Sequence, residues 1–227
     1  MLFMYYWKHI ANPLHGMTGM NLRTKTQDII GESYRHALFY AFPGGLRFEL
    51  SEGGSPLDQV LTALRKAMVI CADVFDGEGP LLVHLQRFAP PSRFRLRAML
   101  REFRLAGIAL PRDRDIWLET VTQAEQDDDG HEDGAWIHCV FELPLSRLKN
   151  LLWCAFSADF PALSPNPGCL IYLLDPGRGI VVHPYDDRGM DVIARRSSVL
   201  EALYERHNAL LLPYDMDVMR QTFGPPA

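Results

Sequence analysis

The segment from His183 to Ala194 contains the residues whose types and spacing come closest to supporting chemistry. It reads His-Pro-Tyr-Asp-Asp-Arg-Gly-Met-Asp-Val-Ile-Ala, so one imidazole precedes the adjacent carboxylates of Asp186 and Asp187. Such groups can together hold a divalent metal ion or move protons during catalysis. No second set of His and Asp residues follows at a matching spacing. We therefore predict no metal and no catalytic site, and an enzyme with an atypical site near Asp186 stays open as an alternative.

A tight turn explains the same residues without chemistry. Asp186 or Asp187 can accept hydrogen bonds from the backbone amides of such a turn, and Gly189 can take the positive φ that a turn requires. Arg188 can pair with a nearby carboxylate. We therefore predict that Tyr185 to Gly189 is a structural turn or strand edge, in which at least one aspartate bonds to backbone amides or to an arginine.

The stretch from Tyr185 to Ile193 resembles the signature of a bacterial family known only as domain-of-unknown-function family 3885. That signature is a Tyr-Asp-Asp-Arg-Gly motif followed by a strand of the Met-Asp-Val-Ile type. Phe42 to Leu50 and Leu203 to Arg206 are also similar to family members, so the resemblance extends from Asn21 to Phe223. It implies a bacterial origin, and it implies no particular activity.

A dense acidic run is the second feature that could carry function. Six carboxylates lie within nine residues, at Glu125, Asp127, Asp128, Asp129, Glu132 and Asp133. The spacing does not fit a calcium-binding EF-hand loop, because its closing glutamate is missing. The run is either a solvated loop or a docking surface for a basic protein, since clustered charge speeds encounter and restricts partner choice. We expect an exposed loop that a basic partner engages.

The cysteines and the remaining histidines give no stronger candidate. His138 and Cys139 are neighbours in a predicted strand, where adjacent side chains point to opposite faces of the sheet. The cysteines lack any Cys-x-x-Cys spacing, so we interpret them as reduced and mostly buried thiols. They lie at Cys71, Cys139, Cys154 and Cys169.

Nucleotide and nucleic-acid binding find little support in the sequence. No Gly-x-Ser-x-Gly elbow, phosphate loop or dinucleotide fingerprint is present, so we predict no cofactor. The net charge is −5, from 23 basic and 28 acidic residues, whereas binding to a phosphate backbone depends on excess basic charge. A row of arginines along one predicted helix could still contact phosphates, at Arg93, Arg97, Arg101 and Arg104.

The composition is that of an ordinary globular protein. The chain has 227 residues, of which 48% are hydrophobic, and no run approaches the roughly 20 apolar residues of a membrane-spanning helix. The apolar start, Met1 to Trp7, has no preceding basic residue and no cleavage site after it, so we expect no signal peptide and a cytoplasmic location. We treat residues 1–20 as an extension and residues 21–227 as one domain.

Hydrophobic periodicity gives the elements that must position these residues. We expect an α+β fold, in which about four to five amphipathic helices pack on an antiparallel or mixed sheet. One helix should start at the Ser55 cap, with a buried stripe at Leu57, Val60, Leu61, Leu64, Met68 and Cys71. Further helices are expected over 21–34, 92–104, 144–156 and from 198. Strands are expected at 38–42 and 46–50 as a hairpin, and at 81–88, 116–121, 135–143, 169–174, 179–183 and 190–194.

Together these observations favour a binding protein over an enzyme. Acidic charge, a dense acidic run and a bacterial family without catalytic motifs lead us to expect an immunity or antitoxin protein that neutralises a toxin by direct binding. Its partner would be a basic protein domain. The alternatives are the enzyme noted above and a phage-related regulator that contacts nucleic acid.

Overall fold

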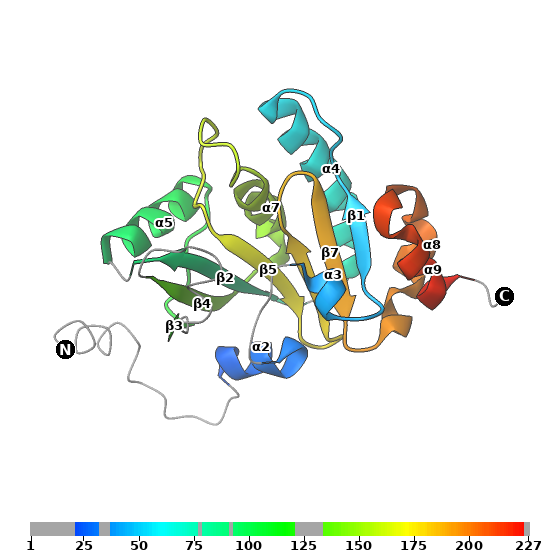
Figure 1. Ribbon diagram of the computed structural model, residues 1–227. Coiled ribbons are helices and arrows are strands. Elements are labelled where there is room, and N and C mark those ends of the chain that lie inside the picture. Colours follow the sequence, from blue (N-terminus) through cyan, green and yellow to red (C-terminus); the bar gives the residue numbers. More distant parts are fainter. Residues whose placement is uncertain (1–20, 32–36, 77–78, 91–92, 121–133, 225–227) are drawn as a thin grey trace.

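The chain forms a seven-stranded antiparallel sheet within the residues that the computed structural model describes, which are 21–31, 37–76, 79–90, 93–120 and 134–224 (Figure 1). The strand order is β1-β7-β6-β5-β2-β4-β3, and every pair is antiparallel. The strands are β1 (Leu46–Glu49), β2 (Leu81–Ala89), β3 (Arg114–Thr120), β4 (Ala135–Leu143), β5 (Leu170–Asp175), β6 (Ile180–Pro184) and β7 (Gly189–Ala194). The α+β fold predicted from the sequence is confirmed.

Seven α-helices accompany the sheet in the described part, which exceeds the four to five expected. They are α2 (Leu22–Ile30), α3 (Leu38–Ala41), α4 (Pro56–Val74), α5 (Arg93–Leu105), α7 (Leu148–Phe156), α8 (Glu201–Arg206) and α9 (Met216–Phe223). Short 3-10 turns η1 (Leu145–Arg147), η2 (Ser197–Leu200), η3 (Asn208–Leu210) and η4 (Pro213–Asp215) complete the described elements.

The helices divide between the two faces of the sheet. Alternate residues of β2 show the division, because Leu81, Val83 and Leu85 belong to the large core, whereas Leu82 belongs to a smaller second core. Helices α4, α5, α7, α8 and α9 supply the large core. Helix α3 and partly buried residues of α2 pack on the second core, so this face is covered over part of its area.

Helix α4 begins as the sequence predicts and buries part of the expected stripe, at Val60, Leu64 and Cys71. Ser55 Oγ accepts a hydrogen bond from the Asp58 amide at 3.2 Å, with Pro56 in the first turn. Leu57 and Leu61, which were expected in the core, are each 49% exposed. The reason is that the buried face is centred on small and branched residues, namely Val60, Ala63, Ala67, Ile70 and Val74.

The hairpin predicted over residues 38–50 is wrong. Residues 38–41 form α3, and β1 pairs instead with β7, so that Phe48 lies opposite Met190. A contact remote in sequence explains the difference, because the amide of Phe39 donates to the buried carboxylate of Asp191 at 3.0 Å. Such a bond fixes the first turn of α3 only after β7 is in place.

No helix in the described ranges is both long and apolar enough to cross a lipid bilayer.

Candidate functional site

The family motif forms the turn between β6 and β7. Asp186 Oδ1 accepts hydrogen bonds from the backbone amides of Arg188 and Gly189, at 2.8 Å and 3.1 Å. Its other oxygen accepts from the Arg188 guanidinium, with an Nε distance of 3.0 Å. Asp187 accepts a hydrogen bond from the Ser51 hydroxyl at 2.7 Å, which ties the turn to the end of β1. Both aspartates are buried.

Gly189 serves the turn differently from the expectation. It does not adopt a positive φ. Glycine is needed because the ring of Tyr185 occupies the space that a Cβ at position 189 would fill. Glycine at position 189 therefore makes room for the Tyr185 ring and is not required by the backbone conformation of the turn.

A buried network of charged side chains connects β1, β7 and η4. Arg47 Nε on β1 contacts Asp191 Oδ1 on β7 at 3.1 Å, and Arg47 Nη1 contacts Asp215 Oδ2 at 3.3 Å. The Tyr40 hydroxyl donates to Asp215 Oδ1 at 3.0 Å. Burial raises the pKa of Asp191 to about 6, although the Phe39 amide and Arg47 act in the opposite direction. Two carboxylates thus share one arginine.

Three aromatic rings surround the same guanidinium. The Arg47 Cζ atom lies 4.8 Å from the ring centre of Tyr40, 5.1 Å from that of Tyr185 and 5.9 Å from that of Phe39. Cations are attracted to aromatic ring faces at such distances. Tyr185 and Asp191 of the motif therefore contribute to one structural centre with Arg47, which the sequence alone did not reveal because Arg47 lies far from the motif along the chain.

Next to this network, histidines and aromatic rings form a row across the sheet face that carries the second core. His84 Nε2 lies 3.0 Å from His138 Nδ1, and the His138 ring stacks on Trp117 with a centroid distance of 4.7 Å. Burial, and secondarily Arg23, lowers the pKa of His138 to about 4. Burial and His138 also lower the pKa of His84. Both imidazoles are therefore neutral at pH 7.

His183 does not join Asp186 and Asp187 in one cluster. Its ring stacks on Tyr172 with a centroid distance of 4.2 Å, and its Nδ1 atom lies 3.2 Å from the carbonyl oxygen of Ile171. The two aspartates bond instead to the groups of the turn described above. No group of three or more His, Cys, Asp or Glu side chains in the described ranges is arranged to hold a metal ion.

A cleft of about 490 Å³ opens beside the turn. Its walls include the rings of Phe88, Trp136 and Tyr185 and the buried side chain of Gln86. Three charged residues, Arg87, Asp159 and Asp186, also line it. The volume falls within the range usual for ligand pockets.

Asp159 is the exposed carboxylate of this cleft. Partial burial raises its pKa, and the negative charges of Asp186 and Asp187 add to that effect, whereas Arg188 opposes it. Asp186 already binds Arg188, and Arg87 donates to the Pro167 carbonyl oxygen at 3.0 Å. Asp159 has no hydrogen bond or ion pair to another described residue, so its charge faces solvent.

The acidic run lies outside the described residues, so nothing in the structure describes Glu125, Asp127, Asp128, Asp129, Glu132 or Asp133. The residue that follows the run is described. Gly134 lies against the Phe88 ring so closely that a Cβ there would meet the ring at 2.5 Å. The chain therefore leaves the acidic run beside a wall of the cleft, at the sheet end where β2 stops and β4 begins.

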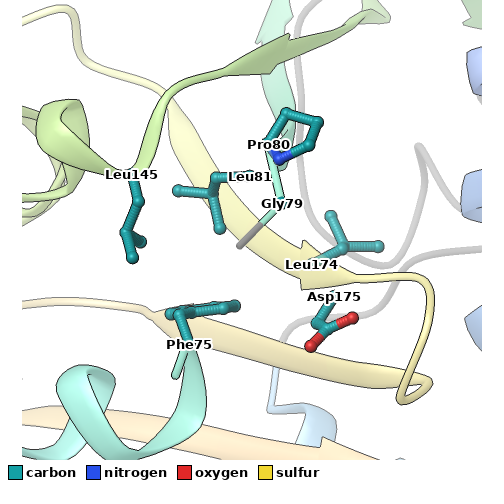
Figure 2. A pocket seen from close by; sticks show the side chains of 7 residues that line it. All are labelled: Phe75, Gly79, Pro80, Leu81, Leu145, Leu174 and Asp175. Carbon is teal, nitrogen blue, oxygen red and sulfur yellow. The ribbon is translucent and has the colours of Figure 1, made fainter. Parts of the chain in front are cut away.

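Two further pockets lie elsewhere. Figure 2 shows the smaller one, of about 120 Å³, at the opposite end of the sheet, where Phe75, Leu81 and Leu145 surround it. Its one acidic side chain, Asp175, already accepts a hydrogen bond from the amide of Arg178 at 3.1 Å. The other is a groove between helices α4, α5 and α7.

The cysteines are free and buried, as expected. Burial raises the pKa of Cys71, Cys139 and Cys154 to about 12, and it also raises that of Cys169. These groups are thiols at neutral pH, whereas a cysteine nucleophile needs the thiolate form.

The comparison with protein families assigns the chain to a family. The family described as Domain of unknown function (DUF3885) matches residues 21–215, which include the turn, Arg47, Asp191 and the cleft. The chain belongs to this family. No curated protein and no solved structure matches it. The matched residues include Arg47 and both of its carboxylate partners. Arg47 lies near the start of the match, and Asp215 is its last residue.

Proposed function

We propose that this DUF3885 member is a non-catalytic bacterial protein that acts in the cytoplasm by binding a basic protein partner. The mode would be that of an immunity protein or antitoxin, which neutralises a toxin by covering its active surface. The observation that carries the proposal is the cleft beside the family turn, because its exposed carboxylate at Asp159 lies near two more carboxylates.

The electrostatics of this cleft favour a cationic partner group. Partial burial raises the pKa of Asp159, and the like charges of Asp186 and Asp187 add to this effect while Arg188 opposes it. A guanidinium or ammonium group placed beside Asp159 would offset that repulsion. The rings of Phe88, Trp136 and Tyr185 also line the cleft, and cations are attracted to aromatic rings.

The acidic run, which carries charge of the same sign, joins the described chain at this end of the sheet. Its last residue, Asp133, directly precedes Gly134, which contacts Phe88 in the cleft wall. Six carboxylates attached here would attract a basic surface over distances comparable to the Debye length, roughly 8 Å at physiological salt. Long-range charge mainly raises the association rate, and the apolar cleft walls would then slow dissociation.

The ionisable groups of the described part support binding more than chemistry. The His84 and His138 rings are buried with lowered pKa values, and the four thiols are buried with raised ones. The rival proposal of a His183 and Asp186 site has less support, because the His183 ring contacts Tyr172 and the Asp186 carboxylate bonds to its own turn.

The test is the kinetics of partner association. The partner is first captured with the tagged full chain and identified, and it should be basic. Association rates are then measured for the native chain, for Asp159→Asn and for the combined change of Asp127, Asp128 and Asp129 to Asn. Both variants should associate several-fold more slowly at low salt, and the difference should shrink above about 0.15 M salt.

Asp217→Asn is the matched control, because Asp217 is an exposed aspartate on α9 with a side chain that is 93% accessible. This variant should associate at nearly the native rate. An acidic partner, or association rates that are equal for all variants at low salt, would contradict the proposal. Unfolding temperatures should stay nearly unchanged, since exposed substitutions usually cost within about 0.5 kcal/mol.

A further inference from the structure

An apolar groove lies on the helical side of the molecule, where α4, the end of α5 and α7 meet. Its volume is about 410 Å³, and its lining includes Leu64, Leu105, Lys149, Asn150 and Trp153. This position is separate from the acidic cleft, whose helical contribution comes from the far end of α7 and the residues after it.

Two exposed leucines of α4 lie on the same side of the helix as Leu64, which lines the groove. Leu57 and Leu61 precede Leu64 at spacings of four and three residues, so their side chains are neighbours on one side of the helix. Leu57 and Leu61 are each 49% exposed, and Leu105 on the other wall is 63% exposed. Large apolar side chains that cluster at a surface mark interaction sites more often than scattered ones do.

The polar groups of the groove are held by internal hydrogen bonds. The Trp153 indole donates to the carbonyl oxygen of Pro165 at 3.1 Å, and the Asn150 amide donates to that of Ala106 at 2.6 Å. Trp153 is packed against the core. The shape of the groove is therefore formed before any partner arrives, which reduces the ordering cost of binding.

Lys149 is the charged residue among those that line the groove, and most of the exposed charges next to its leucines in sequence are basic, Asp58 beside Leu57 being acidic. Arg65 and Arg104 are exposed neighbours in sequence of Leu64 and Leu105. The acidic residue of α5 in this region, Glu102, is already engaged by Arg101 at 3.2 Å and by the amide of Asn166 at 3.2 Å. The groove thus combines apolar walls with the cation of Lys149.

We propose that this groove binds an acidic amphipathic helix of a partner protein. Leucine-like side chains of that helix would contact Leu57, Leu61 and Trp153, and its carboxylates would face Lys149, Arg65 and Arg104. Helices recognised in this way present apolar residues at spacings of three, four and seven. A second copy of this chain docking groove to groove is disfavoured, because it would place the two sets of cations opposite each other.

A peptide titration of the full chain tests the site. The probe is a designed peptide of about 15 residues, with leucine on one helical face and glutamate elsewhere, and its partner probe carries lysine in place of glutamate. Binding is followed by the indole NMR signal of Trp153 and by fluorescence anisotropy of the labelled peptide. The glutamate peptide should shift the Trp153 signal, and the lysine peptide should not.

Two substitutions separate the apolar and charged contributions. Leu61→Gln should weaken binding of the glutamate peptide about five- to tenfold, because it removes one buried leucine contact. Val69→Gln is the matched control, since Val69 is 54% exposed on another side of the same helix, and it should leave binding unchanged. Lys149→Glu should weaken the glutamate peptide and strengthen the lysine peptide.

Several results would overturn the assignment. Equal effects of the Leu61 and Val69 changes, an unshifted Trp153 signal, or a Trp153 shift that the lysine peptide produces more strongly than the glutamate peptide would each do so. A single-stranded oligonucleotide that binds with sensitivity to Lys149→Glu but not to Leu61→Gln would assign the surface to nucleic acid instead. A lysine peptide bound at the acidic cleft would change the anisotropy without shifting the Trp153 signal, because Trp153 lines the groove and not the cleft. The groove is therefore judged on the Trp153 shift, whether or not Asp159 binds a basic partner.

Discussion

The Tyr185 ring lies directly over Gly189, in the space that any larger side chain at position 189 would need. The centre of the same ring lies 5.1 Å from the Arg47 guanidinium carbon. Gly189 therefore leaves the room that Tyr185 needs to lie beside this cation. The tyrosine and the glycine, four residues apart, are therefore sterically coupled in this chain.

Replacing Gly189 with alanine should displace Tyr185 and lower the free energy of unfolding by about 1 to 3 kcal/mol, the usual cost of overpacking. Urea denaturation would measure the change. Gly79→Ala is a suitable control, because a Cβ at position 79 meets nothing within 4 Å. In a Tyr185→Ala background the added cost of Gly189→Ala should nearly vanish, and an unchanged cost there would refute the steric explanation.

Asp186→Ala should destabilise the chain by about 1 to 3 kcal/mol, because two backbone amides of the turn lose their acceptor. Asp186→Asn retains an acceptor for those amides and loses mainly the ion pair with Arg188, whose side chain is exposed. Exposed ion pairs contribute little, so the asparagine variant should cost clearly less. Equal losses for the two variants in thermal or urea unfolding would show that charge, rather than turn geometry, is what Asp186 supplies.

Asp191 should make stability depend on pH. Its pKa is raised to about 6 in the folded chain, against about 4 when unfolded. Its stabilising contribution is therefore complete below about pH 4 and is lost as the pH rises through 6. The free energy of unfolding of the native chain, relative to that of Asp191→Asn, should fall by about 2 to 3 kcal/mol between pH 4 and pH 7. Parallel pH profiles of the two proteins would disprove the assignment.

Arg47→Met should be among the most damaging single changes, with a loss of about 3 to 5 kcal/mol, because it leaves Asp191 and Asp215 buried without their shared cation. Adding Asp191→Asn and Asp215→Asn to the same chain should restore part of the loss. A combined variant that is less stable than Arg47→Met alone would mean that the carboxylates stabilise the fold through contacts other than Arg47.

Much of the framework follows from local sequence patterns. The Ser55 and Pro56 start of α4 and the alternation along β2 and β4 are encoded within each segment, and these elements were predictable. The hairpin over residues 38–50 failed because its apolar residues suit a strand, whereas the bond from the Phe39 amide to Asp191 is a tertiary contact that no local pattern contains. Leu57 and Leu61 fit a buried stripe by spacing, but the sequence does not say where the neighbouring helices end.

The candidate site was predictable only in part. The motif directed attention to Tyr185 and Asp186, and the turn could be inferred from residue types alone. Arg47, Asp159 and Asp215 were missed, because each becomes informative only when strands and helices distant in sequence meet. Arg47 lies near the start of the family match and Asp215 at its end. A search for oppositely charged residues in the segments before and after the motif could have suggested this pair.

The position of β1 at the edge of the sheet has a consequence for the order of folding. Strands β5, β6 and β7 follow one another along the chain and pair through short connections, whereas β1 must wait for β7, because Leu46 lies opposite Val192. Contacts between residues remote in sequence usually form late. We expect the Asp191 carboxylate to be still hydrated in the transition state for folding, and Arg47 to reach it only after this rate-limiting step. Raising the pH from 4 to 7 should then accelerate unfolding and leave the refolding rate nearly constant.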